Sequence, residues 1–192
     1  MKPKGRVVIF TAPSGAGKTT VVRHLLRKYE NLDFSISATT REKRPYEEEG
    51  VDYYFLTEEE FRTKVDNGEF LEWEEVYSGT YYGTLLSEVD RIWSEGKQIV
   101  FDVDVKGATS IKQHFGDSAL AVFIKPPSLQ VLIDRLTGRG TESQKALKSR
   151  IERVKNELTY EHRFDKILVN DILEVTLKEA EMMIEDFLKW NS

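Results

Sequence analysis

Short apolar runs recur along the chain and predict its strands. Two of them are apolar nearly throughout, as parallel strands buried on both faces are: 98–105 (QIVFDVDV) and 120–125 (LAVFIK). The β-branched and aromatic run 6–12 (RVVIFTA) predicts another buried strand, and 166–170 (KILVN) predicts a last one. Three further strand-like segments are 34–38 (FSISA), 52–57 (DYYFLT) and the aromatic, acidic 69–84.

Stretches with helical periodicity separate these runs. In residues 18–29, four apolar side chains share one helical face: Val21, Val22, Leu25 and Leu26. Thr57 and Glu60 form a capping box that opens a short helix. Further helices are expected at 85–93, 107–116, 128–136 and 173–190, with a long one that follows a polar, glycine-bearing segment at 137–149 and ends near 160.

Strands that alternate with helix-length segments predict an α/β fold, with a parallel sheet and helices on both of its faces. Residues 33–88 break this alternation with strand-rich, aromatic and acidic sequence. We expect them to form an insertion at the carboxyl edge of the sheet, where ligands bind in such folds. The length of 192 residues suits one domain.

Charge and composition exclude several classes of function. A net charge of −5 argues against a dedicated nucleic-acid binder, because phosphate contacts need a basic surface. The chain has no cysteine, which removes disulfides and thiolate catalysis and suits a reducing cytoplasm. Its histidines (His24, His114 and His162) lack ligand spacing, and we find neither a targeting segment nor ~18 consecutive apolar residues. We therefore expect a soluble, cytoplasmic protein without a membrane partner.

Residues 11–20 (TAPSGAGKTT) nearly match the phosphate-loop pattern G-x-x-x-x-G-K-[ST]. They follow a predicted strand and open a predicted helix, where backbone N–H groups and the helix N-terminus can hold phosphates. Lys18 would reach the β- and γ-phosphates, and the Thr19 hydroxyl would bind Mg²⁺. A glycine turn with a surface lysine is the alternative, which the flanking strand and helix disfavour.

Ala12 stands where the pattern has its first glycine. It precedes Pro13, and a residue before proline adopts extended backbone angles with negative φ. Glycine's freedom to adopt positive φ is therefore not needed at this position. We expect Gly15 and Gly17 to be the essential glycines of the loop.

Acidic and basic residues beyond the loop suit phosphoryl transfer. Asp102 and Asp104 end a buried strand and point to one face; such acids usually serve the metal, with capping of the following turn as the weaker alternative. Arg135 and Arg139 lie one helical turn apart, and Arg150 follows beyond a glycine-flanked segment that suits a mobile lid. Guanidinium groups match the oxygens of a transferring phosphoryl group.

The insertion carries side chains suited to a second substrate. Arg41 and Arg44, together with Tyr53 and Tyr82, could hold a phosphate dianion. Glu72 could accept hydrogen bonds from N1 and N2 of guanine, two adjacent donors that adenine lacks.

With these motifs, the chain closely resembles the guanylate kinase family over nearly its whole length. The matching stretches, in order, are PSGAGKTT, ATTREKRPYEEEGVDYYF, GEFLEWEEVYSGTYYGT, DVDVKGA, IKPPSLQVLIDRLTGRGTES and VND. The resemblance implies one domain with a P-loop nucleoside monophosphate kinase fold: a core (1–32, 89–128 and 163–192), a GMP-binding region (33–88) and a lid (about 129–162). It also implies Mg²⁺-dependent phosphorylation of GMP by ATP.

The resemblance further implies roles for individual residues. The transferring phosphoryl group would be stabilised by Lys18, Arg41, Arg135 and Arg150. ATP would be bound by Ala12, Pro13, Ser14, Gly15, Ala16, Gly17, Lys18, Thr19, Thr20, Arg135, Arg139 and, near the adenine, Asn170. GMP would be bound by Ser37, Arg41, Arg44, Glu47, Tyr53, Glu72, Tyr82, Thr84, Asp102 and Asp104, of which Glu72, Thr84 and Asp104 read the guanine. Mg²⁺ would be held by Thr19 and, through water, by Asp102.

The chain departs from the family at Ala12 and by one inserted residue near EVYSG, before Tyr81. Two other functions stay open. A P-loop kinase with another small acceptor is disfavoured by Glu72 and Thr84, and a phosphopeptide-binding module is disfavoured by the complete phosphate loop. The expected partners are ATP and GMP, with dGMP, and no nucleic acid. The sequence leaves the oligomeric state open.

Overall fold

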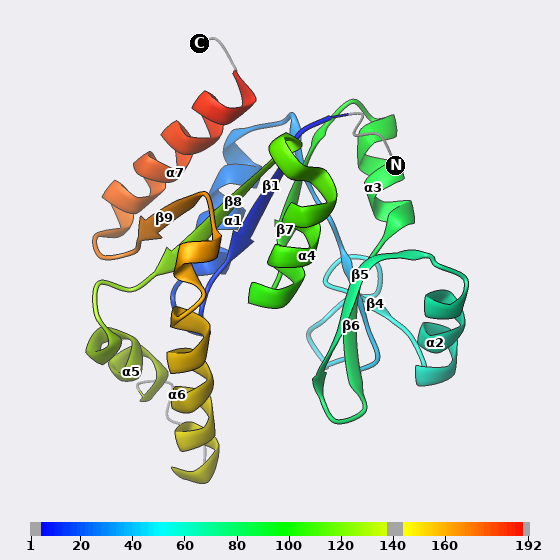
Figure 1. Ribbon diagram of the computed structural model, residues 1–192, viewed down its shortest axis with the longest axis horizontal. Helices are drawn as coiled ribbons and strands as arrows, with labels where there is room; N and C mark the ends of the chain where they lie inside the picture. Colours follow the sequence, from blue (N-terminus) through cyan, green and yellow to red (C-terminus); the bar gives the residue numbers. More distant parts are fainter. Residues whose placement is uncertain (1–4, 138–143, 190–192) are drawn as a thin grey trace.

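The computed structural model describes residues 5–137 and 144–189, and its main sheet is a five-stranded, parallel one (Figure 1). The strand order is β2-β7-β1-β8-β9, and every pairing in this sheet is parallel. Its strands are β1 (Val7–Thr11), β2 (Leu32–Phe34), β7 (Gln98–Asp102), β8 (Ala119–Lys125) and β9 (Lys166–Val169). The predicted parallel α/β fold is therefore confirmed.

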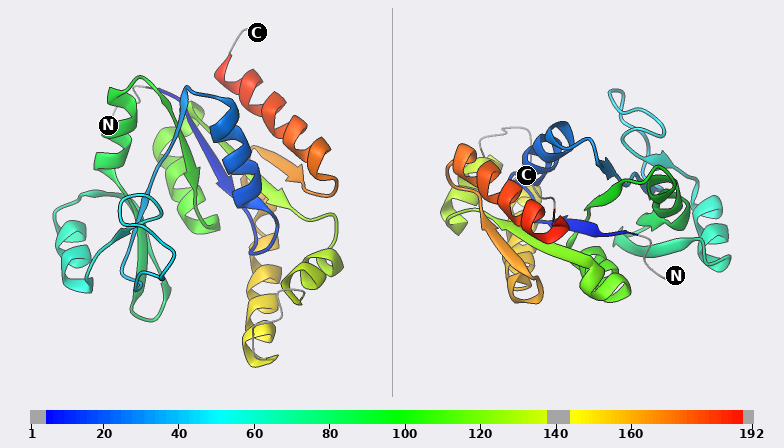
Figure 2. Two further views of the ribbon diagram at one scale, coloured as in Figure 1. Left: turned by 180° about the vertical axis from the view of Figure 1, so that it is seen from behind. Right: turned by 90° about the horizontal axis from the view of Figure 1, so that it is seen from above.

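Helices connect these strands and cover the sheet (Figures 1 and 2). The α-helices are α1 (Lys18–Lys28), α2 (Glu58–Asp66), α3 (Leu86–Ser94), α4 (Val105–Phe115), α5 (Leu129–Thr137), α6 (Gln144–Leu158) and α7 (Leu173–Leu188). Two 3₁₀ turns lie at Gly116–Ser118 and Glu161–Arg163.

Strand β1 shows why both faces of the sheet are covered. Its side chains alternate between the faces, and all five of its residues are buried. Val8 and Phe10 belong to the core cluster formed with α1 and α7, whereas Val7 and Ile9 belong to the cluster formed with α3 and α4. A strand that is buried at every position therefore fits only the middle of such a sheet.

The insertion forms a second sheet of four strands, in the order β4-β3-β6-β5. Its strands are β3 (Ser37–Thr39), β4 (Tyr54–Phe55), β5 (Phe70–Tyr77) and β6 (Thr80–Leu85). The pairings β3–β6 and β5–β6 are antiparallel, and β3–β4 is parallel. In Figure 1 this sheet lies on one side of the carboxyl ends of the parallel strands, and α5 and α6 lie on the other.

Three predicted boundaries are wrong. The strand expected at 98–105 ends at Asp102, so Asp104 lies outside it, and α4 begins at Val105. The single strand expected at 34–38 is divided between β2 and β3, which belong to different sheets. At the division, the backbone N–H of Ile36 donates to the buried carboxylate of Glu88 at 3.0 Å instead of to a neighbouring strand. Helix α6 begins at Gln144, within the segment expected to be a loop, because QKALK is made of good helix formers.

The predicted capping box is confirmed at the start of α2, where Thr57 and Glu60 bond reciprocally. Among the described residues, none of the helices combines the length and apolar character needed to cross a bilayer.

Candidate active site

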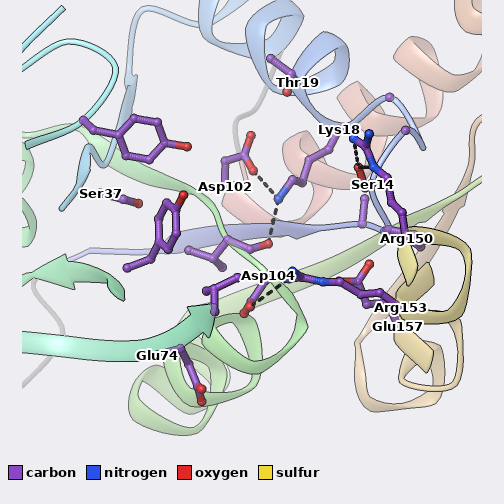
Figure 3. Close-up of a pocket in the computed structure, with 18 of the residues that line it drawn as sticks. Ser14, Lys18, Thr19, Ser37, Glu74, Asp102, Asp104, Arg150, Arg153 and Glu157 are labelled. Atoms are coloured by element: carbon purple, nitrogen blue, oxygen red, sulfur yellow. Dashed lines mark hydrogen bonds and ion pairs between the residues drawn. The ribbon is translucent and has the colours of Figure 1, made fainter. Parts of the chain in front are cut away.

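A cavity of about 960 Å³ opens at the carboxyl ends of the parallel strands (Figure 3). It is bounded by the phosphate loop, by helix α6 and by the second sheet. Predicted site residues that line it are Ala12, Pro13, Ser14, Gly15, Gly17, Lys18, Thr19, Thr20, Ser37, Arg44, Tyr53, Glu72, Tyr82, Asp102, Asp104 and Arg150.

The phosphate loop joins β1 to α1 and depends on two glycines in the left-handed region. Gly15 has φ +89° and Gly17 has φ +96°, a conformation that other L-residues rarely adopt. At Gly17 a Cβ atom would lie 2.1 Å from Nδ2 of Asn170. Among the described non-glycine residues only Lys189 has positive φ, so Ala12 needs no glycine, as predicted.

Asn170 supports the loop from behind. Its side chain is 7% exposed, and Nδ2 donates to the carbonyl oxygen of Ala16 at 2.7 Å. Arg135 in turn donates to the carbonyl oxygen of Asn170 at 3.2 Å. Neither Asn170 nor Arg135 lines the cavity. Their assigned roles toward ATP stay predictions.

The phosphate loop and the start of α6 form one wall of the cavity, which we call the loop wall. Its cations, Lys18 and Arg150, are bound to groups within the protein (Figure 3). Lys18 forms an ion pair with Asp102 and donates to the carbonyl oxygen of Val103 at 2.9 Å. Arg150 reaches from α6 to Oγ of Ser14, at 2.9 Å from its terminal nitrogen. Both cations therefore lie where incoming phosphate oxygens could replace these partners.

Arg41 and Glu47 form a bidentate pair beside the opposite wall. The two nitrogen–oxygen distances are both 2.9 Å, and Nε of Arg41 donates to the hydroxyl of Tyr82 at 3.2 Å. The hydrogen bond from Arg41, followed by one from the backbone N–H of Arg44, lowers the pKa of Glu47 to about 2. The pair with Glu47 likewise raises the pKa of Arg41, so both groups stay charged at neutral pH.

Glu72 on β5 is a mostly buried carboxyl group within the cavity wall. Oγ1 of Thr84, a residue that is 1% exposed, donates to its Oε1 at 2.6 Å. Burial raises the pKa of Glu72 to about 7, an effect that the Thr84 hydrogen bond opposes and the charges of Asp104 and Glu74 reinforce. The carboxyl group is therefore balanced between its neutral and ionised forms near neutral pH.

The two acids after β7 have different partners. Asp102 pairs with Lys18, whereas Asp104 caps α4 by accepting from the backbone N–H groups of Lys106 at 3.1 Å and Gly107 at 2.9 Å. Capping, which the sequence analysis ranked as the weaker alternative, is thus a real function of Asp104. Both acids line the cavity, so capping does not remove Asp104 from the site.

Several predicted residues lie outside the wall of the cavity: Ala16, Arg41, Glu47, Thr84, Arg135 and Asn170. Of these, Arg41, Glu47 and Thr84 contact residues that do line it. Arg139 lies outside the described residues. Lining residues that the sequence analysis missed include Glu74, Ser149, Arg153 and Glu157. The spacing of Arg150 and Arg153, three residues apart on one helix, could have indicated the latter.

A phosphate loop at the carboxyl edge of a parallel sheet, facing a second wall with an arginine and tyrosines across one cavity, defines the P-loop nucleoside monophosphate kinases. The family model described as guanylate kinase matches residues 4–187 of the chain. The chain therefore belongs to the guanylate kinase family.

Individual relatives agree with this assignment. The chain is 47% identical to guanylate kinase of Bacteroides thetaiotaomicron, with 96% of this chain and 90% of the relative covered. It is 50% identical to guanylate kinase of Porphyromonas gingivalis, with 95% and 98% covered. Among solved structures, guanylate kinase from Anaplasma phagocytophilum matches with a TM-score of 0.77 and 28% identity, covering 96% of this chain and 86% of that one.

Proposed function

We propose that the cavity binds ATP at the phosphate loop and GMP at the wall formed by the second sheet, and that the γ-phosphoryl group passes directly between them. The reaction is ATP + GMP → ADP + GDP, the activity of the family to which the chain belongs. One observation carries the proposal: Lys18 and Arg150 line the same cavity of about 960 Å³ as Glu72 and Arg44. Two nucleotides held in one cavity can react as if within one molecule.

For ATP, we assign the phosphates to residues 12–20. The backbone at Gly15 and Gly17 turns N–H groups toward a bound anion. Lys18 exchanges Asp102 for the β- and γ-phosphates. Arg135, Arg139 and Asn170 complete the assigned set, with Asn170 toward the adenine.

Thr19 and Asp102 are the residues we assign to Mg²⁺. Both line the open cavity and both offer oxygen, the donor that Mg²⁺ prefers, while the cavity leaves room for the waters that this ion keeps. When bound, the ion neutralises charge on the β- and γ-phosphates. We assign Asp102 a contact through water, and its carboxylate becomes available when Lys18 exchanges it for the phosphates.

For the phosphate of GMP, we assign Arg41, Arg44, Tyr53 and Tyr82. Arg41 already uses four of its five N–H groups: one from Nε, two from one terminal nitrogen and one from the other. The Glu47 carboxylate fixes the plane of its guanidinium group. Contact between Arg41 and the transferring phosphoryl group through more than one hydrogen bond therefore requires Arg41 to exchange some of these bonds.

For the guanine base, we assign Glu72, Thr84, Asp104 and Ser37. An ionised Glu72 accepts from N1–H and N2–H, and Thr84 orients that carboxylate from behind. A site built around these acceptors penalises adenine, whose corresponding edge leaves the carboxylate without its donors.

In the transfer step, an oxygen of the GMP phosphate attacks the γ-phosphorus in line. The bond from this phosphorus to the bridging oxygen breaks, and ADP leaves with that oxygen. Lys18, Arg41, Arg135 and Arg150 stabilise the charge on the transferring group. No side chain forms a covalent intermediate. Closure of the lid and of the GMP-binding region, at the boundaries predicted from the sequence, excludes water from the phosphoryl group.

We extend the proposal to dGMP, because none of the assigned residues is directed at the sugar. A cytoplasmic location stays a prediction from the sequence, and the assignment makes no choice between a monomer and a homo-oligomer.

Replacing Lys18 with Met tests the proposal. With ATP and GMP, a coupled assay of ADP release should show kcat lower by about 10²–10³-fold, the cost of removing one transition-state donor. Thermal unfolding should show that the variant stays folded. Equal turnover by the variant and the wild type would exclude the proposed use of the loop.

A further inference from the structure

Arg153 on α6 lines the cavity but has no role in the reaction described above. Its Nε donates to Oε1 of Glu157 at 2.8 Å, one helical turn along. Glu157 is only 8% exposed and lines the same cavity, so this carboxylate holds the arginine at the cavity wall. A terminal nitrogen of Arg153 then lies 4.0 Å from Oδ2 of Asp104 (Figure 3).

The carboxylate of Asp104 is divided between two tasks. Its Oδ1 accepts from two backbone N–H groups at the start of α4, those of Lys106 and Gly107. Its Oδ2 is the oxygen nearer to Arg153. The oxygen that remains for a ligand is therefore the one nearer to the arginine.

Arg153 also lies beside a group of acids. Glu72, Glu74 and Asp104 all line this part of the cavity. Lys106 pairs with Glu74 at 3.1 Å, and Arg153 is the cation that approaches Asp104 from the other side. The charge on Asp104 disfavours ionisation of Glu72, so a cation beside Asp104 favours the ionised Glu72 that guanine requires.

We propose that Arg153 is a positioning residue for guanine recognition, acting through Asp104: from α6 it orients Oδ2 toward the base and offsets the repulsion among the acids. The inference rests on the proposed function, because it takes GMP as the ligand of Asp104. It links the helix that carries Arg150 to the recognition of the other nucleotide.

Arg153→Met tests this role, with Lys155→Met on the same helix as a matched control. Lys155 is exposed and does not line the cavity. Arg153→Met should raise the KM for GMP by about three- to fivefold, the range for a partly exposed ion pair, with the KM for ATP within about twofold of the wild type. Arg153→Lys, which keeps the charge, should restore at least half of the loss, and Lys155→Met should change neither KM.

A double-mutant cycle with Asp104→Asn separates this role from a structural one. In the Asp104→Asn background, Arg153→Met should change the KM for GMP by less than about twofold, because the partner is already lost. A full three- to fivefold effect in that background would overturn the proposal, since Arg153 would then act without Asp104. So would an equal rise in the KM for ATP, which would mean that α6 itself is disturbed.

The two proposals fail in different ways. A wild-type protein that does not phosphorylate GMP contradicts the proposed function. A wild-type protein that does, with an unchanged KM for GMP in Arg153→Met, contradicts only the role of Arg153.

Discussion

The two walls of the cavity are built in different ways. The loop wall is made mainly of backbone, to which Lys18 and Arg150 add their side chains: consecutive residues between β1 and α1 take their shape from two glycines with positive φ and from one buried amide behind them. The opposite wall, which we call the acceptor wall, is made of side chains that come from different elements: Ser37 on β3, Glu72 on β5, Tyr82 on β6 and Asp104 before α4. One wall is local in sequence, and the other is assembled by the fold.

This difference separates what each wall can recognise. Backbone N–H groups at a helix N-terminus bind any phosphate, so the loop carries little information about the nucleotide beyond its charge. Carboxylates and hydroxyls at fixed positions distinguish one base from another, because an unmatched polar group is left unpaired. Under the proposed function, the loop wall therefore supplies reactivity and the acceptor wall supplies specificity.

The largest effect is expected from Gly17→Ala, which should impair the use of ATP at the loop wall and leave GMP binding nearly unchanged. The added Cβ would lie 2.1 Å from Nδ2 of Asn170, on a backbone at φ +96°. Because a displacement of about 1 Å can cost about 10²-fold, kcat/KM for ATP should fall by at least that factor. The Kd for GMP, measured by calorimetry, should stay within about threefold of the wild type.

Ala12→Gly is the matched control within the same loop. Ala12 has negative φ, so glycine there should leave kcat/KM for ATP within about twofold of the wild type. A large loss in Ala12→Gly would contradict the division of roles among the small residues of the loop.

Glu72→Gln should break the acceptor wall alone. The amide offers one acceptor in place of two, so kcat/KM for GMP should fall by about 10–50-fold, while the KM for ATP stays within about twofold. Steady-state kinetics with each substrate varied in turn measure both values. Glu75→Gln, an exposed position on the same strand, is the control. Equal losses toward ATP and GMP would show that the walls are not independent.

The smallest expected effect is that of pH on GMP binding at the acceptor wall. Burial raises the pKa of Glu72 to about 7, and in the proposed binding mode only the ionised form can accept from both N1–H and N2–H of guanine. GMP binding should therefore weaken as the pH falls through this value, by about tenfold between pH 8 and pH 6. Glu72→Gln should lose this component and retain only the titration of the GMP phosphate. Parallel pH profiles of the two proteins would contradict the role of Glu72.

The structure of the loop wall is easier to predict from the sequence than that of the acceptor wall. The loop could be predicted in detail, down to the irrelevance of glycine at Ala12, because its determinants are adjacent in the sequence: Pro13, Gly15 and Gly17. The parallel sheet could be predicted because β1, β7 and β8 are buried on both faces and their sequences show it.

The contacts of the acceptor wall could not be predicted, because they depend on tertiary structure. Capping of α4 by Asp104 is a local feature that the sequence offered as the weaker alternative, but nothing near Asp104 indicates that its other oxygen approaches Arg153, some fifty residues on. Likewise, the sequence does not show that Glu47 pairs with Arg41 instead of facing a ligand. This pairing forms only because the loop between β3 and β4 folds back. Where residues 34–38 divide between two sheets, the backbone of Ile36 bonds to Glu88, far away in the chain.

A comparison of phosphoryl acceptors tests the central claim, that the acceptor wall selects guanine, most directly. With ATP as the donor, kcat/KM should be measured for GMP, AMP, CMP and UMP under the same conditions. The account predicts that GMP exceeds each of the others by at least about 10²-fold, as expected for a site whose acceptors are matched only by guanine. Equal or greater kcat/KM for any other base would contradict it.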